Sequence, residues 1–181
     1  MGFVEETSIA QHYRDARITT IYEGTTGIQA NDLIGRKVLR DGGRSMQALL
    51  SQIDAVCEQL EAGDDAQLHA IGARLREGSK SLADSVRWIL ATGMQDLNAV
   101  LAGAVPFLHL CGVVCGGWQM ARAALAAQRK LAAGDSDAAF YRAKVATARF
   151  FADQDLSRAR GLAEATMHAG ASTMALAEEQ F

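Results

Sequence analysis

The chain has 181 residues, of which 49% are hydrophobic and 22% charged, and its net charge is −3 at pH 7. This composition excludes a disordered protein, and a slightly acidic chain without a basic run has no general attraction for nucleic acid. One proline, only 6% aromatic residues and many alanines in periodic segments favour an all-α fold, which is large enough for one domain or two small helical ones.

The three cysteines, Cys57, Cys111 and Cys115, all lie within apolar periodic segments. An odd and sparse set of this kind is typical of reduced, buried thiols rather than of a disulfide framework. Reduced thiols, together with an N-terminus that does not follow the basic-then-apolar pattern of a signal peptide, lead us to expect a cytoplasmic protein.

The first predicted helix covers residues 5–17. Thr7 and Ser8 are candidates for its cap, and apolar residues recur behind them at helical spacing. A β-branched cluster at 18–21 ends the helix, because such side chains lose rotamer freedom in helical backbone. No self-sufficient unit precedes this helix, which suggests the end of something larger.

A second helix is predicted to start after a cap at Thr25 or Thr26 and to run to about residue 40. Basic residues crowd its last turns, where the helix dipole favours them, and the Gly42-Gly43 pair stops it. The same glycine pair is the expected domain boundary. The two expected units are residues 1–42 and residues 43–181.

Beyond residue 43 the pattern predicts only helices, with apolar residues at helical spacing and breaks at the Gly-Asp segments 63–65 and 134–137. About four long helices joined by short connections pack most naturally as an antiparallel bundle of the four-helix type. The expected helices are 45–62, 66 to about 103 with a bend at Gly78 or Gly93, 106–133, 138–155 and 157–179.

A nearly uncharged run at 99–117 is long enough to be compared with a membrane-spanning helix. It contains Pro106, His109 and four glycines, and it crosses an expected helix junction. We therefore expect a buried core helix here and no membrane-spanning segment.

Two residue pairs at helical spacing have the chemistry of metal ligands. Cys111 and Cys115 lie one turn apart with His109 nearby, but a metal site would need further ligands from other helices. Glu164 and His168 are also one turn apart, yet a carboxylate di-iron bundle needs a different spacing and a second copy of the motif. Ordinary helix packing explains both pairs, so no metal is expected.

The remaining candidate site is the loop at 22–25, since the sequence has no dinucleotide-binding glycine motif, P-loop or serine nucleophile elbow. A ligand that excludes water from a loop carboxylate makes it a stronger base, and Gly24 lets the backbone approach a substrate. The hydroxyls and free amides of 25–27 would suit an anionic group at a helix N-terminus. From these residues alone, Glu23 is either a catalytic base or an ordinary loop carboxylate.

The segment from Tyr13 to Gln29 resembles the C-terminal motif of the flavin-dependent acyl-CoA dehydrogenases. That family commonly shows Arg-Asp-Ala-Arg/Lys-Ile, a short spacer and Ile-Tyr-Glu-Gly-Thr-x-x-Ile-Gln, and the same residue types stand here at 14–18, 21–25 and 28–29. A looser similarity, carried by Ala104-Val105-Pro106-Phe107-Leu108 and Gly116-Gly117-Trp118, extends the match. It resembles the subgroup with an extra C-terminal helical domain, which includes the 3-methylmercaptopropionyl-CoA dehydrogenases.

The resemblance implies that residues 1–42 form the end of the family's catalytic helical bundle and that an accessory helical bundle follows. It implies that Glu23 is the catalytic base, which takes the α-proton of an acyl-CoA thioester while the β-carbon hydride passes to flavin N5. Tyr22 and Gly24 would border the substrate. The residues implied on the cofactor side are Thr25, Thr26, Gly27 and Gln29.

The same resemblance implies FAD as cofactor, an electron-transfer flavoprotein as electron acceptor, and a homo-oligomeric oxidoreductase of fatty acid metabolism. The family's N-terminal helical and middle β-domains supply most of the flavin and CoA contacts, so the chain by itself is expected to be inactive. Two alternatives stay open. One is a non-catalytic helical packing or oligomerisation module, and the other is an acyl-CoA oxidase, which would share the base but pass electrons to oxygen.

Overall fold

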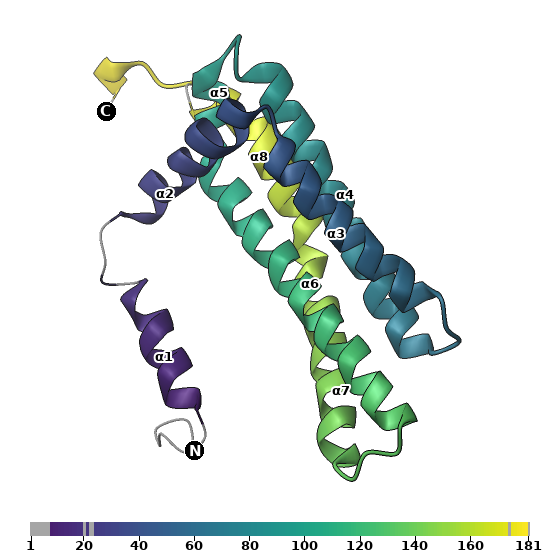
Figure 1. Cartoon of the computed structure of the whole chain (residues 1–181). Helices are drawn as coiled ribbons and strands as arrows, with labels where there is room; N and C mark the ends of the chain where they lie inside the picture. Colours follow the sequence, from purple (N-terminus) through teal and green to yellow (C-terminus); the bar gives the residue numbers. More distant parts are fainter. Residues whose placement is uncertain (1–7, 20, 22–23, 174, 181) are drawn as a thin grey trace.

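The structure is a computed structural model, and it describes residues 8–19, 21, 24–173 and 175–180. All regular elements within these residues are helical, which confirms the all-α fold (Figure 1). The α-helices are α1 (Ile9–Ile18), α2 (Thr26–Asp32), α3 (Arg44–Glu61), α4 (Ala66–Thr92), α5 (Leu97–Ala102), α6 (Ala104–Ala132), α7 (Ala138–Gln154) and α8 (Ala159–Thr173). A π-helical segment, η2 (Leu33–Leu39), continues α2, and two 3₁₀ turns, η3 (Leu156–Arg158) and η4 (Glu178–Gln180), precede and follow α8.

Helices α3, α4 and α6, together with the column formed by α7, η3 and α8, make the antiparallel bundle that the sequence predicts (Figure 1). Helices α3 and α4 form a hairpin, α6 runs back against α4, and the α7–α8 column returns along α6. The central pair is α4 and α6, whose inward side chains Leu75, Leu82, Phe107 and Val114 are fully buried. Burial of these apolar side chains between α4 and α6 therefore contributes to the stability of the bundle.

The helix formed by α2 and η2 packs across one end of the bundle. Its fully buried residues Ala30, Ile34 and Val38 belong to the same core as the bundle helices, and the segment contacts α3, α4 and α6. Helix α1 differs, because it stands apart from the bundle and its Tyr13 side chain is 69% exposed (Figure 1). Of the two helices that flank the predicted loop, the second is thus anchored in the core, while the first lies outside it.

The Gly42-Gly43 pair ends this helix as predicted. Both glycines have left-handed backbone, with φ of 65° and 77°, which residues with side chains rarely adopt. The Gly43 amide faces the Val38 carbonyl at 2.9 Å and the Asp41 carboxylate at 2.8 Å, and hydrogen bonds from Ser45 hold the pKa of Asp41 below its ordinary value. The chain therefore reverses sharply between η2 and α3.

The helix predicted from 66 to about 103 is interrupted at Gly93, one of the two predicted bends, and the chain there divides into α4 and α5. Gly93 follows the last residue of α4 and lies against the Leu39 side chain, whose Cδ2 would be 2.7 Å from an added Cβ. Asp96 then starts a new helix by accepting a hydrogen bond from the Ala99 amide at 2.9 Å. Gly78, the other predicted bend, lies within continuous α4.

Two terminal helix limits also differ from the prediction. Helix α1 begins at Ile9, and Ser8 adopts a left-handed φ of 59° and makes no side-chain cap, whereas Thr7 lies outside the described residues. Helix α8 ends at Thr173 rather than near 179. The Ser172 hydroxyl donates to the Ala169 carbonyl at 3.1 Å, and hydroxyl side chains of this kind compete with helical backbone bonds.

Among the described helices, α6 is long and apolar enough by length and composition to cross a membrane. In this fold it is the helix against which α2, α3, α4, α7 and α8 all pack, which agrees with the predicted core helix. Small residues allow close approach on one side: a Cβ on Gly117 would lie 2.7 Å from Leu156 Cδ2. Gly112, by contrast, has open space where a Cβ would stand.

Candidate functional site

The predicted catalytic loop lies between α1 and α2. Tyr22 and Glu23 lie outside the described residues, so the structure describes Ile21 before them and the chain from Gly24 onward. Gly24 has a φ of 101°, in the left-handed region that strongly favours glycine. This backbone conformation gives a physical reason for a glycine directly after the acidic residue of the loop.

Thr25 caps α2, which decides between the two predicted caps. Its backbone is extended (φ −66°, ψ 160°), and its hydroxyl accepts a hydrogen bond from the Ile28 amide at 3.4 Å. Its carbonyl accepts the first helical bond, from the Gln29 amide at 3.0 Å. The amides of Thr26 and Gly27 are therefore the first-turn donors that point out of the helix without a helical acceptor.

Gln29 lies beside Gly24. A Cβ added to Gly24 would overlap the side-chain amide nitrogen of Gln29, so the glutamine folds back over the loop. No described residue stands within 4 Å of a Cβ built on Gly27, so the described part of the chain leaves that side of the helix start open. The structure thus brings together Gly24, Thr25 and Gln29, with Thr26 and Gly27 on the adjoining turn.

The surroundings of the loop are exposed and apolar. Ile21 is 68% exposed and Ile28 is 62% exposed, and Ile18 at the end of α1 is also exposed. Isolated exposed apolar residues are common, but several of them around one loop are typical of a surface that another part of a protein covers.

The three thiols do not have the environment of reactive cysteines. Burial raises the pKa of Cys57 to about 11 and that of Cys111 to about 12, and burial also raises the pKa of Cys115. A raised pKa keeps these groups protonated near neutral pH, whereas nucleophilic and metal-binding cysteines act as thiolates. Within the described residues, no group of three or more His, Cys, Asp and Glu side chains is placed to hold a metal ion.

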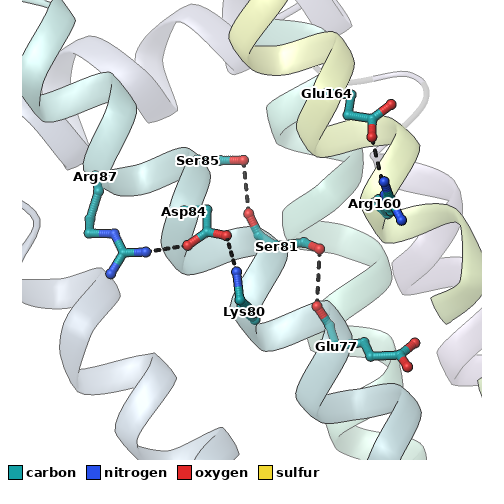
Figure 2. A network of polar contacts seen from close by, with 8 residues as sticks. All are labelled: Glu77, Lys80, Ser81, Asp84, Ser85, Arg87, Arg160 and Glu164. Carbon is teal, nitrogen blue, oxygen red and sulfur yellow. Dashed lines mark hydrogen bonds and ion pairs between the residues drawn. The ribbon is translucent and has the colours of Figure 1, made fainter.

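Glu164, one of the two candidate ligands on α8, is instead paired with Arg160 of the same helix at 3.1 Å. Figure 2 shows this pair beside a ladder of charges on α4, in which Asp84 contacts both Lys80 and Arg87. These side chains lie on the solvent-facing side of the bundle, and exposed pairs of this kind contribute little stability.

Two models of protein families match the chain in succession. The model described as "Acyl-CoA dehydrogenase, C-terminal domain" matches residues 1–39, and the model described as "Acetyl-CoA dehydrogenase C-terminal like" matches residues 49–177. The first range contains the candidate loop, and the second contains the antiparallel bundle.

Several proteins to which the chain is similar are named as dehydrogenases of CoA compounds. The chain is 53% identical over 156 residues to 3-methylmercaptopropionyl-CoA dehydrogenase of Ruegeria pomeroyi, which covers 86% of this chain and 26% of the relative. It is 33% identical over 157 residues to the broad-specificity linear acyl-CoA dehydrogenase FadE5 of Mycobacterium tuberculosis, covering 83% of this chain and 26% of that protein. A butyryl-CoA dehydrogenase of Syntrophomonas wolfei is 29% identical over 99% of this chain and 30% of its own length.

The chain spans about a quarter of the length of the first two relatives. Because one family model covers residues 49–177 and another covers 1–39, the resemblance seen in the loop motif extends through both parts of the chain. The chain therefore belongs to the acyl-CoA dehydrogenase family and corresponds to the family's C-terminal helical region.

Proposed function

We propose that this chain is the C-terminal portion of an FAD-dependent acyl-CoA dehydrogenase, which introduces an α,β double bond into an acyl-CoA thioester. The observation that carries the proposal is the succession of the two family matches, with the acidic loop motif inside the first. The 53% identity to 3-methylmercaptopropionyl-CoA dehydrogenase supports the same reaction class. The division into a catalytic part at 1–42 and an accessory bundle at 43–181 belongs to this proposal.

Glu23 is the proposed catalytic base, which removes the α-proton of the thioester. Negative charge then builds on the thioester carbonyl, and the backbone amide of Glu23 is the proposed donor to that oxygen. Tyr22 and Gly24 are the proposed border of the acyl group. The left-handed, exposed backbone of Gly24 supports this role, because a residue without a side chain lets the substrate approach.

The start of α2 is the proposed contact with the FAD diphosphate and adenosine side, through Thr25, Thr26, Gly27 and Gln29. Its donors fit such a group: the outward amides of the first turn and the exposed side chains of Thr26 and Gln29 suit phosphate oxygens. No described residue fills the space beside Gly27, which leaves room for the approach of the cofactor. When bound, the flavin supplies the hydride acceptor for the β-carbon.

The remaining flavin and CoA contacts are assigned to N-terminal helical and middle β-domains of the complete enzyme. The exposed apolar residues around the loop, Ile18, Ile21 and Ile28, support a covering domain there. We further propose a cytoplasmic homo-oligomer that passes electrons to an electron-transfer flavoprotein. The chain alone is expected to bind FAD poorly and to be inactive.

A chimera tests the proposed function. Residues 1–181 replace the matching C-terminal segment of 3-methylmercaptopropionyl-CoA dehydrogenase, and reduction of bound flavin is followed by its absorbance after an acyl-CoA is added. The flavin absorbance of the unmodified chimera is expected to decrease (bleach) as the flavin is reduced. Glu23→Gln is expected to retain FAD and acyl-CoA binding and to lose flavin reduction.

Glu58→Gln is the matched control, because Glu58 is an exposed glutamate on α3 and lies outside the loop. It is expected to bleach like the unmodified chimera. Flavin reduction that persists in Glu23→Gln would remove Glu23 from the role of base. Bleaching coupled to rapid peroxide formation in air would point instead to an oxidase.

A further inference from the structure

The outer side of the α6–α7 hairpin carries an apolar groove that the proposed catalytic role does not use. The groove has a volume of about 640 Å³, with alanines of α6 such as Ala126 and Ala127 at its floor. Phe140 and Tyr141 of α7 line it, and their rings pack edge to face with centroids 5.5 Å apart. Phe140 remains 49% exposed, so this groove offers an aromatic contact to a second molecule.

The rim of this α6–α7 groove is positively charged. Arg129, Lys130 and Lys144 line it, and Lys144 lies 5.1 Å from the centre of the Phe140 ring. Lys130 has Asp135 as an ion-pair partner at 3.3 Å, while Arg129 and Lys144 form no ion pair with any other described residue. No acidic residue occurs between Asp96 and Asp135 in the sequence. A basic apolar groove in a protein of net charge −3 favours an acidic apolar occupant.

The segment that follows α8 has that chemistry. Leu176 is 55% exposed, and Glu178 and Glu179 in the η4 turn are exposed as well. The turn is held by a hydrogen bond from the Ala177 amide to the side-chain oxygen of Gln180, at 2.8 Å. We call residues 175–180 the acidic tail, and Figure 1 shows it leaving the bundle at the end opposite the α6–α7 hairpin.

The acidic tail cannot reach the groove of its own molecule. From Tyr141 in the groove to Thr173 at the end of α8, the helical column is roughly 48 Å long at 1.5 Å per residue. The chain from Thr173 to Gln180 spans at most roughly 25 Å when fully extended. This limit does not apply to the acidic tail of a second molecule.

We propose that the acidic tail of one copy docks in the α6–α7 groove of a second copy, so that two bundles associate side by side in antiparallel orientation. The groove and the tail lie at opposite ends of the bundle. When two copies align antiparallel, the tail of each copy therefore lies at the groove of the other. Such a contact is isologous and closes as a two-fold dimer, the commonest symmetry of soluble oligomers. Leu176 packs against Phe140 and the alanine floor, and Glu178 and Glu179 lie against Arg129 and Lys144. The inference concerns assembly and does not depend on the acyl-CoA chemistry.

Charge reversal on either side tests the contact. Sedimentation velocity of the 181-residue chain measures its dimerisation, which is expected to weaken by roughly tenfold or more in Glu178→Lys/Glu179→Lys and in Arg129→Glu/Lys144→Glu. In a dimer of either variant alone, tail and groove carry charge of the same sign at both contacts. In a heterodimer of the two variants, tail and groove carry opposite charge at both contacts, so mixing the variants is expected to restore dimers.

Glu77→Lys/Glu164→Lys is the matched control for the tail variant. It makes the same change in net charge as that variant, at two exposed glutamates on α4 and α8. It is expected to dimerise like the unmodified chain. The proposal is overturned if the unmodified chain is monomeric, if the control dissociates as readily as the tail variant, or if mixing the two variants fails to restore dimers. A monomeric chain that binds dodecanoate in an Arg129- and Lys144-dependent way would assign the groove to a small amphipathic anion instead.

Discussion

The side-chain amide of Gln29 lies against Gly24, across the first turn of α2. This contact, together with the φ of 101° at Gly24, fixes how the chain enters α2 directly after the predicted base. Both features require glycine at position 24, because a methyl group would face an unfavourable backbone conformation and the Gln29 amide at the same time.

Gly24→Ala is therefore expected to rearrange the start of α2. The NMR amide signals of residues 25–29 should shift, whereas those of the bundle core should stay in place. Gly35→Ala is the control, since nothing lies within 4 Å of its added Cβ and alanine favours helical backbone by about 0.5–1 kcal/mol. Unchanged signals at 25–29 in Gly24→Ala would contradict the described loop conformation.

The contact between Gly117 and Leu156 predicts a stability difference between two glycines of one helix. Gly117→Ala would force its Cβ to within 2.7 Å of Leu156 and is expected to lower the free energy of unfolding by about 1–3 kcal/mol. Gly112→Ala meets open space on the same helix and is expected to be neutral or stabilising by up to about 1 kcal/mol. Urea unfolding followed by circular dichroism measures both; equal effects would refute the close packing of α6 on η3.

The cap of α4 predicts a second stability difference. Asp65 accepts hydrogen bonds from the amides of Gln67 (2.8 Å) and Leu68 (3.1 Å), and its other oxygen accepts one from Gln128 of α6 at 3.0 Å. Asp65→Ala is expected to cost about 0.5–2 kcal/mol of unfolding free energy. Asp64→Ala removes the neighbouring exposed carboxylate, and chemical denaturation should show almost no change for it.

The buried thiol of Cys57 is expected to make the folded chain less stable at alkaline pH. Burial raises its pKa from the ordinary 9.0 to about 11, so between these values the unfolded chain loses the thiol proton while the folded chain keeps it. The unfolded state then binds fewer protons, and stability falls as the pH rises above 9.0. Unfolding free energies measured at about pH 8 and about pH 10.5 should differ less for Cys57→Ala than for the unmodified chain.

The sequence predicts local features well where one residue type has a single physical role. The Gly42-Gly43 stop is an example, because two successive left-handed residues demand glycine. A threonine cap at 25 or 26 and the apolar stripe of α3 follow from hydrogen-bonding capacity and helical spacing in the same way, and the structure selects Thr25. The motif around Glu23 indicates the family from its residue order alone, and the family matches confirm that identification.

Features that depend on contacts between distant residues were missed. The choice between the two predicted bends is one such feature. Gly93 lies against the Leu39 side chain from η2 and follows the end of α4, whereas Gly78 lies within continuous α4, and the sequence around each glycine does not distinguish them. The α6–α7 groove had one signal in the sequence, the long stretch without acidic residues before Asp135. That stretch does not reveal which basic side chains of α6 and α7 share a surface.

The sequence by itself determined the helical class, the approximate helices, the loop motif and the family. These properties follow from short-range preferences and residue order, which need no knowledge of what lies across the core. Only the tertiary structure decided that α2 and η2 share the bundle's core, that Gln29 lies on Gly24, and that the basic groove and the acidic tail stand at opposite ends. Packing places residues far apart in the chain against one another, and burial of their side chains then fixes which faces remain open.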